Sequence, residues 1–230
     1  MKRIVFSLML VIVAAISKAQ TADEVIANYI AASGGIEKIS AIKTVKMVGS
    51  LTVQGTEVEV TITASHGIGY RSDIVVPGIG EGFQIYTPTK GWEYLPFQGQ
   101  TSVQEMTEEK LKAGLPQLDL QGQLYNYKEK GNKVELLGKE MFDGMDCYKL
   151  KVETAAGRIT TLFIDSKTYY RVKSVAVSAA SGQIIETIFS NFKKMEDGYT
   201  YPFSQTTANG TIEFSSIEIN KPVDVNLFKI

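Results

Sequence analysis

The sequence predicts a mainly β fold with some α-helix, in which a strongly curved antiparallel sheet forms a half-open barrel covered by helices. Short strand patterns dominate the chain from residue 43 onward. Turn signals such as Ala156-Gly157, Asp197-Gly198 and Asn209-Gly210 separate these patterns at hairpin spacing. An antiparallel sheet of about ten to twelve strands curls rather than staying flat. Two or three helices are expected inside the curl.

The first helix is expected at residues 21–33. Thr21 and Glu24 have the spacing of a capping box, and Val25, Ile26, Tyr29 and Ile30 form one apolar stripe. The glycine pair that follows residue 33 ends the helix. A short second helical turn is expected at residues 36–42.

The expected strands are residues 43–53, 56–64, 70–76, 83–86, 92–97, 133–138, 146–153, 158–165, 169–178, 183–192, 199–207 and 211–220. Gln54-Gly55 predicts a tight hairpin turn between the first two strands, and Ser181-Gly182 predicts a later one. Apolar and polar residues alternate over residues 58–63, which indicates one buried and one solvated face.

The stretch from residue 91 to residue 114 joins an aromatic strand to a short charged helix. Thr107 can cap this helix, which is expected near residues 108–113, and its apolar stripe is thin. Two interpretations stay open: a wall and movable lid of an apolar cavity, or ordinary core packing. The residues expected to contact a ligand in the first interpretation are Trp92, Tyr94, Phe97, Met106 and Leu111.

The N-terminus predicts export. Lys2 and Arg3 precede an apolar run at residues 4–16, and small residues surround an expected cleavage site after Ala19. The domain organisation is therefore a signal peptide at residues 1–19 and one domain at residues 20–230, with no transmembrane segment after cleavage. Because Gln20 would follow the cleavage site, no lipid anchor is expected, and the predicted location is the periplasm.

The composition argues against several kinds of chemistry. After cleavage the chain would carry 21 basic and 25 acidic residues, so no binding to nucleic acid is expected. One histidine and one cysteine make a metal site improbable, and no cofactor motif is present. His66 is expected to be an exposed turn residue, Cys147 a small buried apolar residue and Asp165 a turn former. We therefore predict no catalytic residues and no enzyme activity.

Several segments resemble the periplasmic lipoprotein carriers of the LolA-like, outer-membrane lipoprotein-sorting superfamily. These segments read TKGWEYLPF, LFIDSKTYYRVKSV, SNFKKMEDGYTYPF and INKPVDVNLF. The resemblance implies a half-open barrel with helices as a lid over a cavity for lipoprotein acyl chains. These carriers place a functional arginine before the third strand, whereas residues 64–69 here contain none and His66 is only a loose counterpart. Lipid binding is therefore expected more than transfer from carrier to receptor.

The resulting expectation is a periplasmic carrier or chaperone in lipid transport. Its partners would be a lipid or lipoprotein acyl chain and a membrane-associated protein. The alternative is a non-enzymatic sensor or protein-interaction module of the same fold, because a fold alone does not determine function.

Overall fold

The computed structural model describes residues 20–53, 55–177 and 182–230. The expected signal peptide lies outside these residues, as do Gln54 and Ser181 of two expected turns. The helices are α1 (Ala22–Ala32), α2 (Ile36–Ser40) and α3 (Glu108–Gly114), and the 3-10 turns are η1 (Pro96–Gln98), η2 (Leu115–Leu118) and η3 (Val225–Phe228).

The strands are β1 (Thr44–Val53), β2 (Thr56–Ser65), β3 (Gly69–Val76), β4 (Gly80–Tyr86), β5 (Gly91–Tyr94), β6 (Gln104–Glu105), β7 (Lys133–Phe142), β8 (Met145–Glu153), β9 (Ile159–Asp165), β10 (Arg171–Val177), β11 (Ile184–Lys194), β12 (Thr200–Thr207) and β13 (Gly210–Ile219). In the described part of the chain they form one antiparallel sheet in the order β6-β5-β4-β3-β2-β1-β13-β12-β11-β10-β9-β8-β7. The first and last strands pair at its centre, so both sheet edges come from mid-chain.

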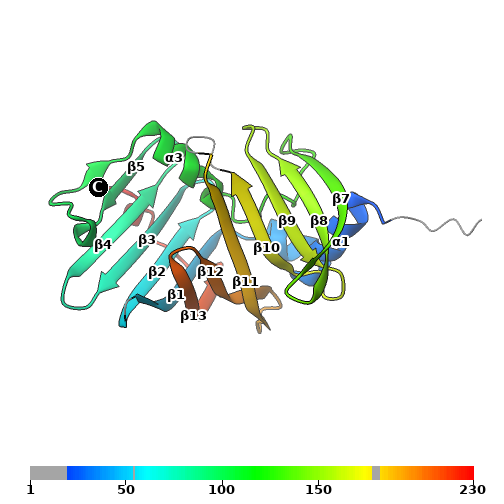
Figure 1. The fold of residues 1–230 in the computed structure, drawn as a ribbon. Helices are drawn as coiled ribbons and strands as arrows, with labels where there is room; N and C mark the ends of the chain where they lie inside the picture. Colours follow the sequence, from blue (N-terminus) through cyan, green and yellow to red (C-terminus); the bar gives the residue numbers. More distant parts are fainter. Residues whose placement is uncertain (1–19, 54, 178–181) are drawn as a thin grey trace, which may run out of the picture.

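The sheet is strongly curved and stays open, which confirms the expected half-open barrel. In Figure 1 its two ends, near β5 and near β7, stand apart, with β1, β13 and β12 between them. We call the face that carries α1, α2 and α3 the concave face, and the other the convex face.

Local signals define α1 as expected. Thr21 Oγ1 accepts a hydrogen bond from the Glu24 N–H, and Glu24 Oε2 accepts one from the Thr21 N–H, which completes the capping box. Val25 and Ile26 are buried against Leu150 and Ile164 of the sheet. The apolar stripe therefore attaches α1 to the concave face of β8 and β9.

Three expected strand boundaries are wrong by three residues or more. The strand expected to begin at residue 83 begins at Gly80. The strand expected to reach residue 97 ends at Tyr94, because Pro96 cannot donate to a ladder and begins the 3-10 turn η1. The strand expected to end at residue 138 runs to Phe142, with a register shift between Leu136 and Lys139. This irregularity lets β7 continue past Gly138, whose φ is +108°.

Candidate functional site

An apolar groove lies between α1 and an irregular segment, residues 119–132, which we call the strap. The groove has a volume of about 480 Å³. Ile26 and Ile30 of α1 and Leu124 of the strap supply its apolar lining, while Asp23 and Lys128 lie at its polar part. The volume falls in the range of small-molecule sites, about 300–1,000 Å³. Apolar side chains with a few polar groups suit a ligand with a hydrocarbon part.

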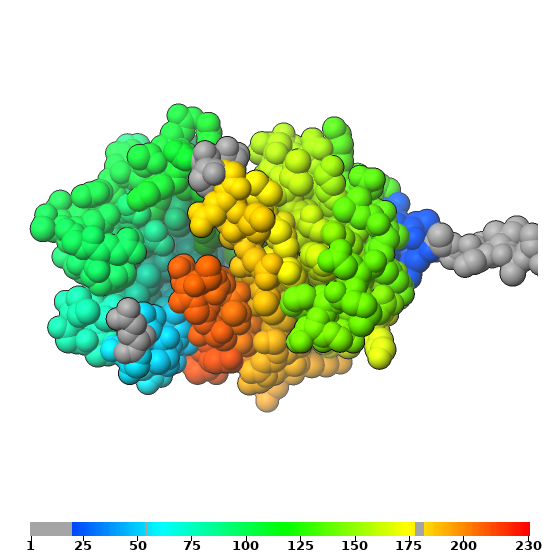
Figure 2. All heavy atoms as spheres, viewed as in Figure 1, coloured from blue at the N-terminus to red at the C-terminus, as the bar shows by residue number. Residues whose placement is uncertain are grey.

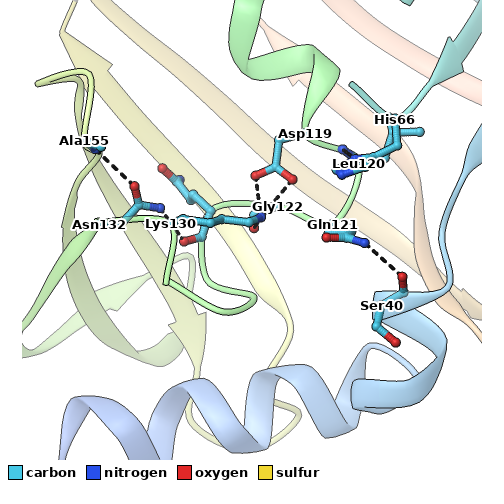
Figure 3. Close-up of polar contacts among 10 residues, drawn as sticks. Ser40, His66, Asp119, Leu120, Gln121, Gly122, Lys130, Asn132 and Ala155 are labelled. Carbon is cyan, nitrogen blue, oxygen red and sulfur yellow. Dashed lines mark hydrogen bonds and ion pairs between the residues drawn. The ribbon is translucent and has the colours of Figure 1, made fainter. Parts of the chain in front are cut away.

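The strap connects both halves of the curved sheet across the concave face. Figure 3 shows its polar contacts: Gln121 Nε2 donates to Ser40 O at 2.9 Å, and the Asn132 side-chain oxygen accepts from the Ala155 N–H at 3.2 Å. Lys130 forms an ion pair with Asp119 at 2.7 Å within the strap itself. These contacts hold the strap to α2 on one side and to the β8–β9 hairpin on the other.

The strap is also packed into the core. Leu124 is buried beside Val25 and Leu150, while Leu120 and Tyr125 pack against the cluster that holds Val45. No helix or strand is expected in this segment from the sequence, because it lacks both helical and strand periodicity. Its apolar residues among turn signals were the only hint of a packed loop.

Helix α3 covers the concave face of β4 and β5. Tyr86, Met106 and Leu118 are buried together, with Leu111 packed against them. A Cβ on Gly114 would lie 2.0 Å from the Tyr86 ring, so the last turn of α3 lies directly on that ring. Thr107 caps the helix through the Lys110 N–H, as expected.

A buried carboxylate attaches α3 to the sheet. Glu93 of β5 is almost fully buried, and its Oε1 accepts from Lys110 Nζ at 2.5 Å and from Gln100 Nε2 at 3.2 Å. Gln84 Nε2 donates to the other oxygen at 3.4 Å. Burial acts to raise the pKa of Glu93, but the bond and charge of Lys110, helped by the two amides, outweigh it and lower the pKa. The helix is therefore held by an ionised, buried partner.

The expected ligand-contacting residues lie on two different faces. Met106 and Leu111 lie with α3 on the concave side, and the Phe97 ring lies over Gly82 on the same side. Trp92 and Tyr94 pair with Ile85 and Phe83, the neighbours that point away from Tyr86 and α3, so both lie on the convex face. The structure thus separates the aromatic pair from the helix, and ligand contact by either set stays a prediction.

Tyr94 lines a second hollow on the convex face. This hollow, of about 340 Å³, also contains Arg71, Asp73 and Phe83. Arg71 forms an ion pair with Asp73 at 2.7 Å and lies over the Phe83 ring at 4.7 Å. Arg71 and Asp73 are paired with each other, so Arg71 offers little to a further anionic ligand.

The single histidine has a structural role. His66 lies in the β2–β3 turn as expected, but it is half-buried, so the expectation of an exposed residue is wrong. Its Nδ1 accepts the Leu120 N–H of the strap at 3.2 Å (Figure 3). This partner lies 54 residues away in the sequence, which is why local patterns did not indicate it.

Cys147 and Asp165 have the structural roles that were expected. The Cys147 side chain is fully buried, and burial, with smaller effects of Asp165 and Asp146, raises the pKa of its thiol to about 11. Asp165 ends β9 and accepts hydrogen bonds from the Thr168 N–H and hydroxyl. Within residues 20–53, 55–177 and 182–230, no group of three metal-ligating side chains lies together.

Solved structures of low sequence identity share this fold. A LolA superfamily protein from Nitrosomonas europaea aligns with a TM-score of 0.58 and 13% identity, over 92% of this chain and 99% of that chain. A DUF1329 family protein from Desulfovibrio piger gives 0.56 and 14%, over 92% and 98%. A putative outer membrane lipoprotein-sorting protein domain from Vibrio parahaemolyticus gives 0.52 and 16%, over 86% and 97%. The expected LolA-like fold is therefore confirmed.

Comparisons with protein-family models and with curated proteins found no match. Among the described residues, no helix is long and apolar enough to cross a membrane.

Proposed function

We propose that this protein binds the acyl chain of a lipid or lipoprotein without catalysing a reaction. The observation that carries this proposal is the apolar groove of about 480 Å³ between α1 and the strap. Ile26, Ile30 and Leu124 are among its apolar lining residues, and both sides of the groove are elements laid onto the sheet rather than strands. Elements of this kind can separate without breaking the sheet.

Burial of hydrocarbon supplies the affinity in this proposal. Each methylene that leaves water contributes about 0.8 kcal/mol, so ten of them contribute roughly 8 kcal/mol. Loss of ligand freedom and ordering of the surrounding side chains reduce the net value. A chain of this length would therefore bind usefully in a groove that stays mostly preformed.

Helix α3 is the proposed lid of the concave side. Leu111 of α3 and Met106, which precedes the helix, pack on the concave side, and Phe97 continues that surface beyond β5. Figure 2 shows the molecular surface hollowed between the teal and green strands of the first half and the yellow and orange strands of the second, next to this helix. Trp92 and Tyr94 could contact a ligand only from the convex face.

We propose further that the chain is exported to the periplasm, cleaved after Ala19 and left without a lipid anchor. Lys2, Arg3 and the following apolar run motivate this proposal. Intact mass spectrometry of the protein recovered from the periplasm tests it. A mass that begins at Gln20 is expected, whereas a mass that includes residues 1–19 or an added acyl group would contradict it.

Acyl binding can be tested with the protein comprising residues 20–230 after removal of co-purified lipid. The neutral fluorophore N-phenyl-1-naphthylamine should bind and be displaced by compounds with a dodecyl chain. Ile30→Gln places an amide in the groove and should weaken binding about tenfold, the cost of an unpaired buried polar group. Ile79→Gln is the matched control, because Ile79 is exposed in the β3–β4 turn. Equal affinities of the two variants and the unsubstituted protein would contradict the proposed groove.

A protein-interaction module is the second candidate, and the sheet edge supports it. β7 ends the sheet order, so one side of its backbone has no neighbouring strand in the described sheet. Leu137 and Met141 of β7 are exposed. Such an edge can accept an extended segment of a partner. This candidate would be favoured if the lipid-free protein binds none of the acyl probes but forms a stable complex with another protein.

A further inference from the structure

Arg171 at the start of β10 points into the half-barrel. A register shift between Arg171 and Lys173 pairs them with Ile164 and Phe163, which are neighbours on β9 and so face opposite sides of the sheet. Ile164 is buried with Val25 of α1 on the concave face. Lys173 lies on the convex side, where it forms an ion pair with Glu186 at 2.7 Å.

The guanidinium of Arg171 lies over an aromatic ring. Its central carbon is 4.3 Å from the centroid of Phe189 on β11, and the Arg171 side chain is half-buried. A ring face gives a cation some stabilisation but does not pair its N–H groups with an oxygen acceptor. Among the described residues, Arg171 forms no ion pair and its side chain makes no hydrogen bond within the chain.

Two tyrosines, Tyr29 and Tyr201, lie on the same concave face as this cation, and Arg171 acts electrostatically on Tyr201. The Thr200 N–H donates to Ser33 O at 3.2 Å, which places the end of α1 next to the start of β12. Tyr29 of α1 and Tyr201 of β12 both face the concave side and influence each other electrostatically, and neither phenol has a hydrogen-bond partner in the described part of the chain. Both side chains are half-buried.

The electrostatics fit a site that donates hydrogen bonds. Burial raises the pKa of Tyr201 to about 12; nearby Tyr29 adds to the rise, while Arg171 opposes it. Tyr201 therefore keeps its proton at neutral pH. One cation and two hydroxyl groups thus lie on the concave face, with no carboxylate paired to the cation in the described chain.

We propose that Arg171, Tyr29 and Tyr201 bind the anionic end, a carboxylate or phosphate, of the acyl ligand. Guanidinium and carboxylate or phosphate match in geometry, and hydrogen bonds to a charged group are stronger than neutral ones. The inference rests on the proposed acyl binding and specifies its ligand as an ionised amphiphile rather than a neutral lipid. The Phe189 ring holds the guanidinium in place from one side.

The test compares dodecanoate with 1-dodecanol at pH 8, by displacement of N-phenyl-1-naphthylamine. The two compounds share a chain and differ in charge, so the unsubstituted protein should bind dodecanoate at least about tenfold more tightly. Arg171→Gln should lose at least about tenfold in dodecanoate affinity and leave dodecanol affinity unchanged. Tyr201→Phe should weaken only dodecanoate, and it decides the question if Arg171→Gln does not fold.

Arg71→Gln is the matched control. Arg71 also lies over an aromatic ring, that of Phe83, but on the convex face and already paired with Asp73. It should leave both affinities unchanged. The anionic site would be overturned if the unsubstituted protein binds dodecanoate and dodecanol with equal affinity, or if Arg171→Gln weakens the binding of both equally. Acyl binding itself would still stand.

Two further outcomes separate the possible sources of the anion. Inorganic phosphate should not displace dodecanoate, whereas dodecyl phosphate should. Displacement by inorganic phosphate at concentrations similar to dodecyl phosphate would assign the site to a free anion and overturn the inference. If neither dodecanoate nor dodecanol binds, both the proposed function and this inference fail.

Discussion

The ion pair between Lys110 of α3 and Glu93 of β5 allows a sharp test of how the proposed lid is held. The two partners differ in exposure: the Glu93 side chain is 5% exposed and the Lys110 side chain 57%. Lys110→Met therefore leaves a buried carboxylate with only two amide donors, Gln84 and Gln100. Glu93→Gln instead releases a lysine that can return to water.

The expected costs follow from this asymmetry. An uncompensated buried charge costs about 1–3 kcal/mol or more, so Lys110→Met should lower the free energy of unfolding at pH 7 by about 2 kcal/mol. Glu93→Gln keeps a polar side chain for both amides and should cost about 1 kcal/mol. In the double variant the buried charge is gone, so the free energy of unfolding should fall by no more than it does in Lys110→Met alone. Urea unfolding measures all three values.

The pH dependence has a defined sign. The folded-state pKa of Glu93 lies below its ordinary value, so its stabilising effect is present above about pH 4.5 and is lost as the pH falls through the folded-state pKa. In Lys110→Met, burial dominates and the Glu93 pKa rises, so protonation relieves the buried charge. The difference in the free energy of unfolding between Lys110→Met and the unsubstituted protein should therefore become smaller as the pH falls from 7 to 4.

Lys112→Met is the control, because Lys112 pairs on the same helix with Glu108 and both side chains are exposed. Exposed pairs contribute little, so this variant should unfold like the unsubstituted protein. If Lys110→Met is no less stable than Lys112→Met at pH 7, the buried carboxylate does not hold α3 and the reasoning fails.

Three further predictions concern Leu124 of the strap, His66 beside the strap and the buried Cys147 of β8. Leu124→Ala should lower the free energy of unfolding by about 3 kcal/mol, since the side chain is buried between α1 and the sheet; a urea-derived loss under about 1 kcal/mol would show that the strap is loosely packed. His66→Ala removes the acceptor of the Leu120 N–H and should cost about 1 kcal/mol in urea unfolding, with fluorophore affinity unchanged. The Cys147 thiol should ignore Ellman's reagent at pH 8 until urea unfolds the protein, because its pKa is raised to about 11; rapid reaction of the folded protein would contradict this.

Features that depend on neighbours in the sequence could be predicted. The capping box of α1 needs only Thr21 and Glu24, three residues apart, and it forms as expected. Asp165 closes its own turn through Thr168. The alternating pattern of the second half predicted hairpins, and a long antiparallel sheet must curve for steric reasons. Together these signals defined the fold class.

Features that depend on distant partners could not be predicted. The face on which an aromatic residue of β5 lies depends on the register with β4, and the strap depends on apolar partners in both halves of the sheet. Neither leaves a periodic pattern of its own in the sequence.

Arg171 shows the difference between the two kinds of information most clearly. Strict alternation along the strand would place Arg171 and Lys173 on the same face. The extra residue of the β-bulge between them turns Arg171 inward and leaves Lys173 outside. The sequence by itself determined the strand and the charge, because these depend on residue type and short spacing. Only the tertiary structure decided that the cation faces the interior, because that depends on how β10 pairs with β9.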